Sequence, residues 1–555
     1  MKKIDLGVIV TTLIIVTISC SLAFFAARIV GNPKDINLVA KNVSITFTDT
    51  SNIATNETIS PGWNNVKTFT ITNNSKEDFN YNILLKGLVN TFESINTLQY
   101  KITSDTGYNM DNYLNVIKTE TSKDVVLAYD VVIPKGSKQT YQVEFKYISI
   151  EEDQSSDMGK KLGGTLAIEA STGKPKIYDK LLADNPTIKT RTDFSTTLTE
   201  TNVNTLYKTT EDNTDVYYFA GDAKNNWVKF GTWQEDKTIV VGYPPDGEDS
   251  YFPKEFNTML DCTSDSAYTN CEEIPLAKKG DSMYWRIIRT NKDGSIRMLY
   301  SGTSAESQTG FIGMSALNDN KTLDPLYVGY MYGKTKSNNY NDTHANINDS
   351  LIKTKMDAFS QNSFSKYSSY LADSGFCADR SLALDSYPKF DSTAYGITDE
   401  ANKVVDTGLG YGNNFTLYSL YYKYQQKTKP SFKCSNKNDL YTVSNNNGNK
   451  ALKYPVGLLS VDEAIFAGAQ YNSLNRNYYL YNEDEPWWLM DAAGSYNDPN
   501  DPDKTSTLVA SGSQGIYASD VRSELSVRPV VSLKNNVVYK SGKGTYDDPY
   551  QIELR

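Results

Sequence analysis

Apolar and polar residues alternate along the first third of the chain, from about residue 37 to residue 170. In Val43–Thr48, apolar side chains fall on one face and hydroxyl groups on the other, and Thr68–Thr72 repeats this pattern. Tyr141–Tyr147 alternates in the same way, after a turn at Pro134–Gly136. Alternation with period two and frequent turn signals is typical of half-buried antiparallel strands. The pattern predicts an all-β antiparallel sandwich over residues 32–170.

The next segment, residues 171–215, has few large apolar side chains. Ile177–Ala183 can form a short helix that ends before Pro186. From Thr187 to Thr210, ten of 24 residues are threonine. Such a composition cannot bury enough apolar surface to fold alone, so we expect a Thr-rich connector.

Residues 216–555 show a different pattern, with aromatic-rich strands and two amphipathic helices. Trp285–Arg289 and Ile296–Tyr300 flank the sequence Asn-Lys-Asp-Gly, which predicts a β-hairpin. One helix is predicted around residues 351–359, where Leu351, Ile352, Met356 and Phe359 fall on one face. A second begins at Ser460, which forms a capping box with Glu463. We therefore expect an α+β domain here.

The N-terminus is the most apolar part of the chain. Met1-Lys2-Lys3 precedes a 22-residue stretch without formal charge, Leu6–Ala27. A helix of this length crosses a hydrocarbon core of about 30 Å. Basic residues before an apolar span stay in the cytoplasm, which would place the rest of the chain outside the cell. We expect residues 1–31 to be a single-pass transmembrane signal anchor; a cleaved signal peptide and a lipoprotein modified at Cys20 are the alternatives.

Composition and charge narrow the choice of partners. The net charge is −10, and acidic and basic residues are mixed along the chain. Without a basic block, nucleic acid is not an expected partner. The 40 tyrosines fit a binding surface for sugars or proteins, but an AT-rich coding sequence would raise the tyrosine count as well.

Four cysteines lie beyond the apolar segment: Cys262, Cys271, Cys377 and Cys434. An even number outside the cell is compatible with two disulfides, of which three pairings exist. Cys262 and Cys271 flank the shortest loop, so this pair is the easiest to close and leaves Cys377 with Cys434. Free thiols are the alternative. The spacing does not fit a zinc site.

The sequence offers little to a catalytic mechanism. The chain has a single histidine, His344, in a polar loop, and no Gly-x-Ser-x-Gly motif accompanies it. Glu483-Asp484-Glu485, beside two tryptophans, is the nearest candidate for the paired carboxylates of a glycoside hydrolase. Carboxylates in Asp498–Asp503 lack the glycine and the final glutamate of a calcium loop. We expect no enzymatic activity, no cofactor and no metal site.

Five strings in the C-terminal part carry a resemblance to known proteins. They are NWVKFG (226–231), YWRIIR (284–289), VGYMYG (328–333), SVRPVV (526–531) and GTYDDPY (544–550). This region resembles a module of surface proteins from gut-dwelling Gram-positive bacteria, similar to the C-type-lectin-like fold of formylglycine-generating enzymes. The chain lacks the paired cysteines near the C-terminus on which formylglycine generation depends. The N-terminal sandwich loosely resembles camelysin-type subunits of biofilm fibres.

The resemblance implies a membrane-tethered binding protein or adhesin with a lectin-like head. Its ligand would be a glycan or a surface protein of a host or neighbouring cell. A structural subunit of a surface layer or fibre is the alternative, and a carbohydrate-active enzyme is a third hypothesis.

The predicted ligand site lies between Tyr478 and Asp503. In related modules, a Trp-Thr-Met-Ser-Pro-like segment stands where this chain has residues 487–491. Two tryptophans on a strand face opposite sides, so we expect one ring in the core and the other in solvent. Exposed aromatic rings supply rigid contact area for ligands. The candidate binding residues are Tyr478, Tyr481, Glu485, Trp487, Trp488 and Tyr496.

Overall fold

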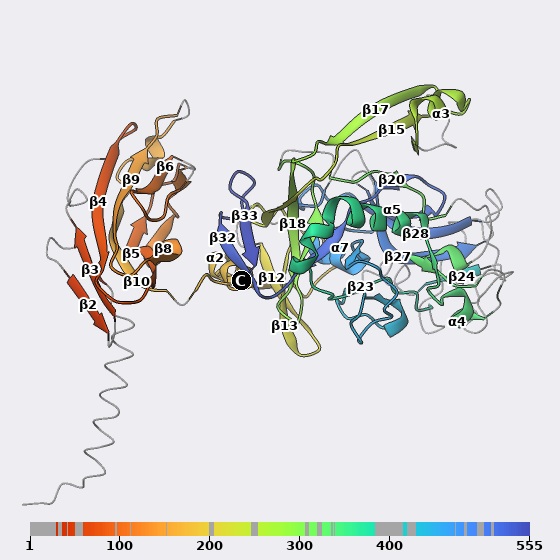
Figure 1. Ribbon diagram of the computed structural model, residues 1–555. Coiled ribbons are helices and arrows are strands. Elements are labelled where there is room, and N and C mark those ends of the chain that lie inside the picture. The colour runs from red at the N-terminus through yellow and green to blue at the C-terminus, as the bar shows by residue number, and fades with distance from the viewer. Residues whose placement is uncertain are drawn as a thin grey trace, which may run out of the picture. The chain divides into compact units, whose positions relative to one another are not determined.

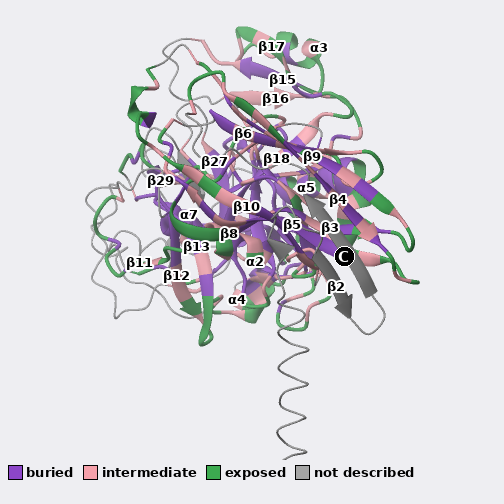
Figure 2. Cartoon of the chain, turned by 90° about the vertical axis from the view of Figure 1, so that its left-hand side faces the viewer, coloured by how far each residue is buried: buried purple, intermediate pink, exposed green. Residues whose placement is uncertain are grey.

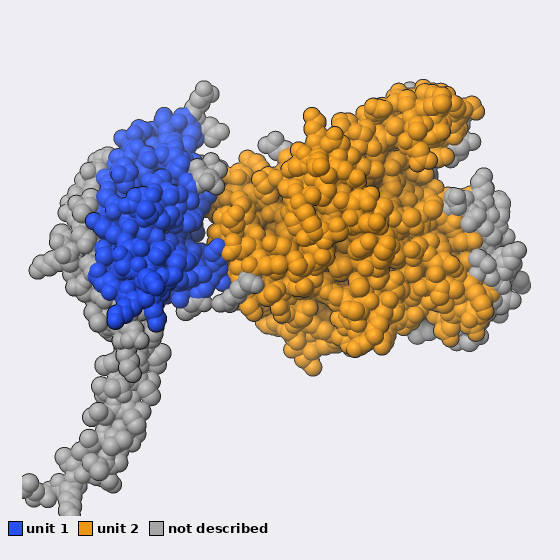
Figure 3. Space-filling view, viewed as in Figure 1, with its two compact units in different colours: residues 1–174 blue, residues 175–555 orange. Residues whose placement is uncertain are grey.

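A computed structural model describes two compact units, residues 1–174 and residues 175–555 (Figure 3). The described residues are 29–30, 36–40, 43–49, 59–94, 97–110, 113–150, 153–171, 173–198, 205–245, 253–305, 310–318, 325–334, 337, 339–382, 415–418, 429–471, 473–481, 486–496, 504–511 and 515–554. The predicted membrane anchor lies outside these residues, except for Ile29 and Val30, which form a strand. Within the described part of the chain, no helix has the length and apolar character needed to cross a bilayer.

Unit 1 consists of two antiparallel sheets, which confirms the predicted β-rich antiparallel architecture. A four-stranded sheet has the order β1-β10-β5-β8, and a six-stranded sheet has the order β2-β3-β4-β9-β6-β7 (Figure 1). The first sheet contains β1 (Ile29–Val30), β10 (Leu162–Ala170), β5 (Phe79–Asn90) and β8 (Thr119–Ile133). The second contains β2 (Ile36–Ala40), β3 (Val43–Asp49), β4 (Asn64–Asn73), β9 (Lys138–Tyr147), β6 (Leu98–Ser104) and β7 (Leu114–Asn115).

The core of unit 1 follows directly from the alternation in its sequence. Along β4 and β9, alternate residues are buried, and these include Phe69, Ile71, Tyr141 and Val143. The two strands pair antiparallel, with Phe69 opposite Tyr141. Their rings stack with centroids 5.1 Å apart, a geometry that adds to the stabilisation from burial alone.

Unit 2 is built around a ten-stranded sheet whose central strands are buried along nearly their whole length (Figure 2). The predicted hairpin is confirmed as β18 and β19, joined by a turn in which Gly294 has a φ of +77°. Burial on both faces explains why apolar residues occupy both faces of these strands and do not alternate regularly with polar ones. The strands are β11 (Lys189–Thr190), β12 (Leu206–Glu211), β13 (Thr214–Phe219), β18 (Ser282–Thr290), β14 (Trp227–Thr232), β33 (Tyr550–Leu554), β32 (Val537–Ser541), β19 (Ile296–Tyr300), β31 (Val530–Leu533) and β26 (Val456–Gly457).

Two further sheets of unit 2 are larger than a strand pair. A six-stranded sheet contains β20 (Met314–Ser315), β30 (Leu525–Ser526), β27 (Trp487–Tyr496), β28 (Lys504–Ser511), β29 (Gly515–Asp520) and β24 (Phe415–Leu417). A three-stranded sheet contains β16 (Lys254–Phe256), β15 (Lys237–Tyr243) and β17 (Asn270–Ala277). With α3 (Met259–Ser264), this sheet forms a projection that we call the arm (Figure 1). Two strand pairs complete the unit: β21 (Met331–Tyr332) with β22 (Asn348–Asp349), and β23 (Phe376–Cys377) with β25 (Leu440–Tyr441).

Short helices pack on these sheets, and both predicted helices of the C-terminal region are confirmed. The first is α5 (Leu351–Phe359), whose N-cap Ser350 accepts a hydrogen bond from the backbone N–H of Lys353. The second is α7 (Val461–Ala467), where Ser460 and Glu463 form the predicted capping box. The other α-helices of the described chain are α2 (Ile177–Asp184), α3 of the arm and α4 (Tyr340–Thr343).

The predicted connector over residues 171–215 requires a correction, because most of it belongs to unit 2. The predicted helix is present as α2, and its Ile177 and Leu181 are buried in the core of the unit. Phe194 and Leu206 are buried in the same core. These buried residues join the segment to the core of unit 2, so its high threonine content did not indicate a free spacer.

Candidate functional site

The predicted site around Trp487 and Trp488 is corrected by the burial of both rings. Their side chains are 2% and 0% exposed. Both residues lie on β27, which pairs with β28 on one edge and, at Trp487, with β30 on the other. The Trp488 indole N–H donates a hydrogen bond of 2.7 Å to the Ser315 carbonyl, and the Arg528 guanidinium lies over the Trp487 ring. Because both faces of β27 are covered, neither ring can meet a ligand.

The other predicted binding residues do not form a surface patch with the tryptophans. Tyr478 is buried, whereas Tyr481 is half-buried and its hydroxyl accepts a hydrogen bond from Arg476 at 3.3 Å. Glu485 and the side chain of Tyr496 lie outside the described part of the chain, so the part they play in a ligand site stays a prediction.

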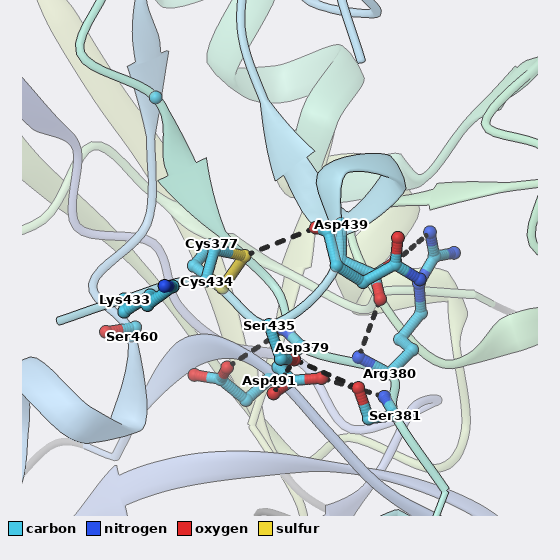
Figure 4. Close-up of a disulfide and its surroundings, with 12 residues drawn as sticks. Cys377, Asp379, Arg380, Ser381, Lys433, Cys434, Ser435, Asp439, Ser460 and Asp491 are labelled. Atoms are coloured by element: carbon cyan, nitrogen blue, oxygen red, sulfur yellow. Dashed lines mark hydrogen bonds and ion pairs between the residues drawn. A yellow bond between two sulfur atoms is a disulfide. The ribbon is translucent and has the colours of Figure 1, made fainter. Parts of the chain in front are cut away.

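Both predicted disulfides are confirmed, Cys262–Cys271 in the arm and Cys377–Cys434 beside α7. Figure 4 shows a polar network next to the second disulfide. The Asp379 carboxylate accepts a hydrogen bond of 2.6 Å from the Ser435 hydroxyl, and the buried Asp491 accepts backbone N–H groups from Asp379 and Val461. Each polar group here is satisfied within the fold, so the network has a structural role.

A second buried network surrounds the single histidine, His344. The fully buried Arg380 forms an ion pair of 2.7 Å with Asp439 and contacts the carbonyl of His344. The His344 Nε2 lies 2.9 Å from the Tyr418 hydroxyl. Burial and the Arg380 charge lower the pKa of His344 to about 3. The imidazole is therefore neutral at physiological pH and belongs to the core of the unit.

A cleft of about 440 Å³ lies where the arm meets the rest of unit 2. Figure 1 shows the arm at the upper right, with α5 and β20 below it. We call this hollow the α5 cleft. Its apolar lining includes the buried Trp233, Ile312 and Phe359 and the more exposed Phe256 and Leu351. The volume is in the range of small-molecule binding sites, about 300–1,000 Å³.

Polar groups from three elements converge at this cleft. Glu255 of β16 forms an ion pair of 2.7 Å with Lys355 of α5, and both side chains are largely buried. The second Glu255 oxygen accepts the backbone N–H of Met314, on β20, at 2.6 Å. The arm, α5 and β20 are therefore joined at one carboxylate.

Gly313 makes this close approach possible. A Cβ atom at this position would lie 2.6 Å from a Glu255 carboxylate oxygen and 2.8 Å from the Lys355 ammonium nitrogen. The residue also has a φ of +138°, which other residues rarely adopt. A side chain here would displace the ion pair.

Glu524 is a second, half-buried carboxyl group of the cleft. It accepts a hydrogen bond of 3.2 Å from the backbone N–H of Glu255, just before β30 begins. Burial raises the pKa of the Glu524 carboxyl above its usual range, while the Glu255 N–H and the Lys355 charge act in the opposite direction. Burial also lowers the pKa of the Lys355 ammonium group, against the attraction of Glu255.

Sequence patterns did not reveal this cleft. Glu255, Lys355 and Glu524 are separated by 100 and 169 positions, so no local motif connects them. The only local signal is Gly313, in the run Phe311-Ile312-Gly313-Met314. A single glycine does not indicate a cleft unless the residues packed around it are known. Among the residues that the structure describes, no group of three or more histidine, cysteine, aspartate or glutamate side chains could hold a metal ion.

Comparison with known proteins adds little to this description. No protein-family model and no curated protein matches the chain. One solved structure, from work on a chaperone–tip adhesin complex in CFA/I fimbriae biogenesis, is 10% identical, with a match that covers 40% of this chain and 84% of that chain. Its TM-score of 0.06 is too low to support an argument about fold or function. The resemblance of residues 216–555 to the C-type-lectin-like fold stays a prediction.

Proposed function

We propose that this chain is a cell-surface binding protein, anchored by its N-terminal apolar segment, whose unit 2 binds a ligand in the α5 cleft. The observation that carries this proposal is the composition of the cleft: an apolar floor beside a small number of converging polar groups. Binding sites for small ligands and side chains have this composition, because apolar surface supplies affinity and placed polar groups supply specificity.

Two further features support an extracellular role. The apolar stretch Leu6–Ala27 after Lys2 and Lys3 favours export of the remaining chain. The disulfides Cys262–Cys271 and Cys377–Cys434 are typical of proteins that fold in an oxidising compartment. The ligand classes consistent with the sequence are a glycan and a surface protein.

The proposal is tested by filling the cleft without disturbing the core. Ala358 is an exposed residue of α5 that lines the cleft, so Ala358→Trp should occupy the space of a ligand. Gln361 is exposed on the next turn and is not part of the lining, so Gln361→Trp is the matched control. The purified full chain is applied to arrays of glycans, mucins and peptides, and thermal unfolding is measured for each variant.

We expect Ala358→Trp to abolish binding and Gln361→Trp to retain it, with both variants folded. Equal binding by the two variants, or no binding by the unmodified chain to any probe, would show that the α5 cleft is not a ligand site.

A further inference from the structure

The turn between β32 and β33 contains a carboxylate oxygen that is buried without a hydrogen bond. Asp548 lies just before β33, and among the described residues its Oδ2 atom has no hydrogen-bond partner. Leaving a buried carboxylate oxygen unsatisfied is unfavourable, so its position needs a physical reason. The next residue is Pro549, so this side chain stands beside an Asp–Pro peptide bond. Asp–Pro bonds are the peptide bonds that break most readily in acid.

Two consecutive backbone N–H groups bind the carbonyl oxygen of this peptide bond. The N–H groups of Lys543 and Gly544 donate hydrogen bonds of 2.8 and 3.0 Å to the Asp548 carbonyl. Successive N–H groups that converge in this way form a nest, a concavity that favours negative charge. These distances match those of the donors in an oxyanion hole, which stabilise the negative oxygen that forms when a carbonyl carbon is attacked.

Two glycines with positive φ allow the turn to approach the Asp–Pro bond this closely. Gly542 has a φ of +94°, and a Cβ atom there would collide with the Pro549 carbonyl oxygen. Gly544 has a φ of +78°, and a Cβ atom there would collide with the Tyr550 ring. The Gly544 carbonyl in turn accepts a hydrogen bond of 2.7 Å from the Trp227 backbone N–H. The two N–H donors are therefore held in place before any reaction.

We infer that the chain cleaves its own peptide bond between Asp548 and Pro549. The Asp548 side chain is the nucleophile, and the N–H groups of Lys543 and Gly544 stabilise the oxyanion. This inference goes beyond the proposed function and does not depend on the α5 cleft.

The reaction has two steps and consumes one water molecule. In the first step, one oxygen of the protonated Asp548 carboxyl group attacks the main-chain carbonyl carbon of the same residue and closes a cyclic anhydride. The C–N bond to Pro549 breaks, and the carboxyl proton moves to the proline nitrogen. In the second step, water opens the anhydride. The products are a chain that ends in Asp548, with both carboxyl groups free, and a segment that begins with Pro549.

The surroundings of Asp548 favour the protonated form that the first step uses. Burial raises the pKa of its carboxyl group, and the negative charge of Asp547 acts in the same direction, against the positive charges of Lys543 and Lys180. The group therefore keeps its proton to a higher pH than an exposed aspartate does. Pro549 contributes as the leaving group, because a secondary amine takes up the proton more readily than a primary amine.

Cleavage leaves the C-terminal strand in its place. Tyr550 is fully buried, and its hydroxyl donates a hydrogen bond of 2.7 Å to Asp184. The strand β33 also pairs with β32 and with β14. The cut chain therefore stays together while it is folded, and its two parts separate when it unfolds.

The test measures the mass of the full chain under denaturing conditions, after incubation of the folded protein at about pH 5, where exposed carboxyl groups are mostly ionised. The chain has three other Asp–Pro bonds, after Asp324, Asp498 and Asp501, which serve as internal references. We expect cleavage after Asp548 to be about 100-fold faster than after each reference residue, the effect of an oxyanion-hole donor. In urea the nest is lost, and the four bonds should break at similar rates.

Two variants assign the nucleophile. Asp548→Asn removes the carboxyl group, whereas Asp547→Asn changes an exposed neighbour and is the matched control. We expect cleavage to be lost in the first variant and retained in the second, with thermal unfolding showing that both are folded.

The comparison of the four bonds uses only the unmodified chain, so it does not depend on the folding of a variant. Equal rates at the four bonds of the folded chain would overturn the inference. The same holds for a fragment that forms as fast in urea as in the folded protein, or one that Asp548→Asn still produces.

Discussion

Both units contain a glutamate held between two basic side chains, and the two arrangements differ in their contact with water. In unit 1, Glu93 bonds Lys118 and Lys160, and its side chain is 42% exposed. In unit 2, Glu463 bonds Arg289 and Arg297 at 2.8 and 3.0 Å, and its side chain is 2% exposed. The comparison separates what a charge cluster does at a surface from what it does inside a fold.

The pKa values of both carboxyl groups are lowered, but the physical causes differ. Glu93 is exposed to solvent, and hydrogen bonds from Lys118 and Lys160 lower the pKa of its carboxyl group. At Glu463, burial acts to raise the pKa, but the charges of Arg297 and Arg289 outweigh it. The buried cluster connects β18, β19 and α7, so it fixes segments that are distant in sequence. Exposed ion pairs contribute little because water solvates each partner well on its own.

The largest expected effect is the loss of stability when Glu463, the buried glutamate, is replaced. Glu463→Ala leaves the buried Arg297 without its ion-pair partner and Arg289 with Glu211 alone, at 3.5 Å, which costs about 3–5 kcal/mol of unfolding free energy. Five of the six tryptophans lie in unit 2, so tryptophan fluorescence during denaturation reports mainly on this unit. Hydrogen exchange of β4 and β9 monitors unit 1, which we expect to be unchanged.

Glu93→Ala is the surface counterpart and serves as the control. Because Glu93 is exposed, the substitution should leave the unfolding of both units within experimental error. A loss of stability as large as that of Glu463→Ala would contradict the distinction between surface and buried clusters.

The disulfides give the next largest effect, and both lie in unit 2. Replacing Cys377 and Cys434 by serine removes a crosslink between positions that are 57 residues apart. The unfolded chain then gains loop entropy, which lowers the free energy of unfolding by about 4 kcal/mol. The same change at Cys262 and Cys271 removes a crosslink between positions 9 residues apart, and it should lower the free energy of unfolding by about 3 kcal/mol. Denaturant titration of the two double variants should give this order, and the reverse order would show that strain or residual structure dominates.

His344 gives unit 2 a source of acid sensitivity that unit 1, which has no histidine, does not share. Its folded pKa is about 3 and its ordinary value is 6.5. Between these values, the unfolded chain binds a proton that the folded chain does not bind. Stability is therefore lost as the pH falls through this window, by about 1.4 kcal/mol per pH unit. His344→Gln should flatten this dependence between pH 6 and about pH 4, and an unchanged slope would count against the assignment.

The smallest expected effect concerns Glu524, on which Lys355 and Lys254 act through their charges, whereas Glu463 forms direct ion pairs. Because burial raises its folded pKa, the folded chain holds this proton more strongly than the unfolded chain. Stability from this group is present at low pH and is lost as the pH rises through the raised folded value. Glu524→Gln should therefore remove a small decline in the stability of unit 2 toward neutral pH. A decline that persists in the variant must come from another group.

Much of the fold could be predicted from the sequence. The alternation of Thr68–Thr72 and Tyr141–Tyr147 predicted strands of unit 1, since one face of each strand packs into the core and the other meets water. The capping box at Ser460 and Glu463 predicted the start of α7, because it depends on residues three positions apart. The short loop between Cys262 and Cys271 favoured the correct disulfide pairing.

Only the tertiary structure decided where the strands of unit 2 face solvent and which distant residues meet. The period of a strand places Trp487 and Trp488 on opposite sides, but their burial depends on what covers each side, and both sides are covered. The pairing of Glu463 with Arg289 and Arg297 and the meeting of Glu255, Lys355 and Glu524 at one cleft likewise join segments far apart in sequence. Local patterns determine elements through short-range backbone and side-chain contacts, whereas the candidate site arises from long-range packing, which leaves no periodic signal in the sequence.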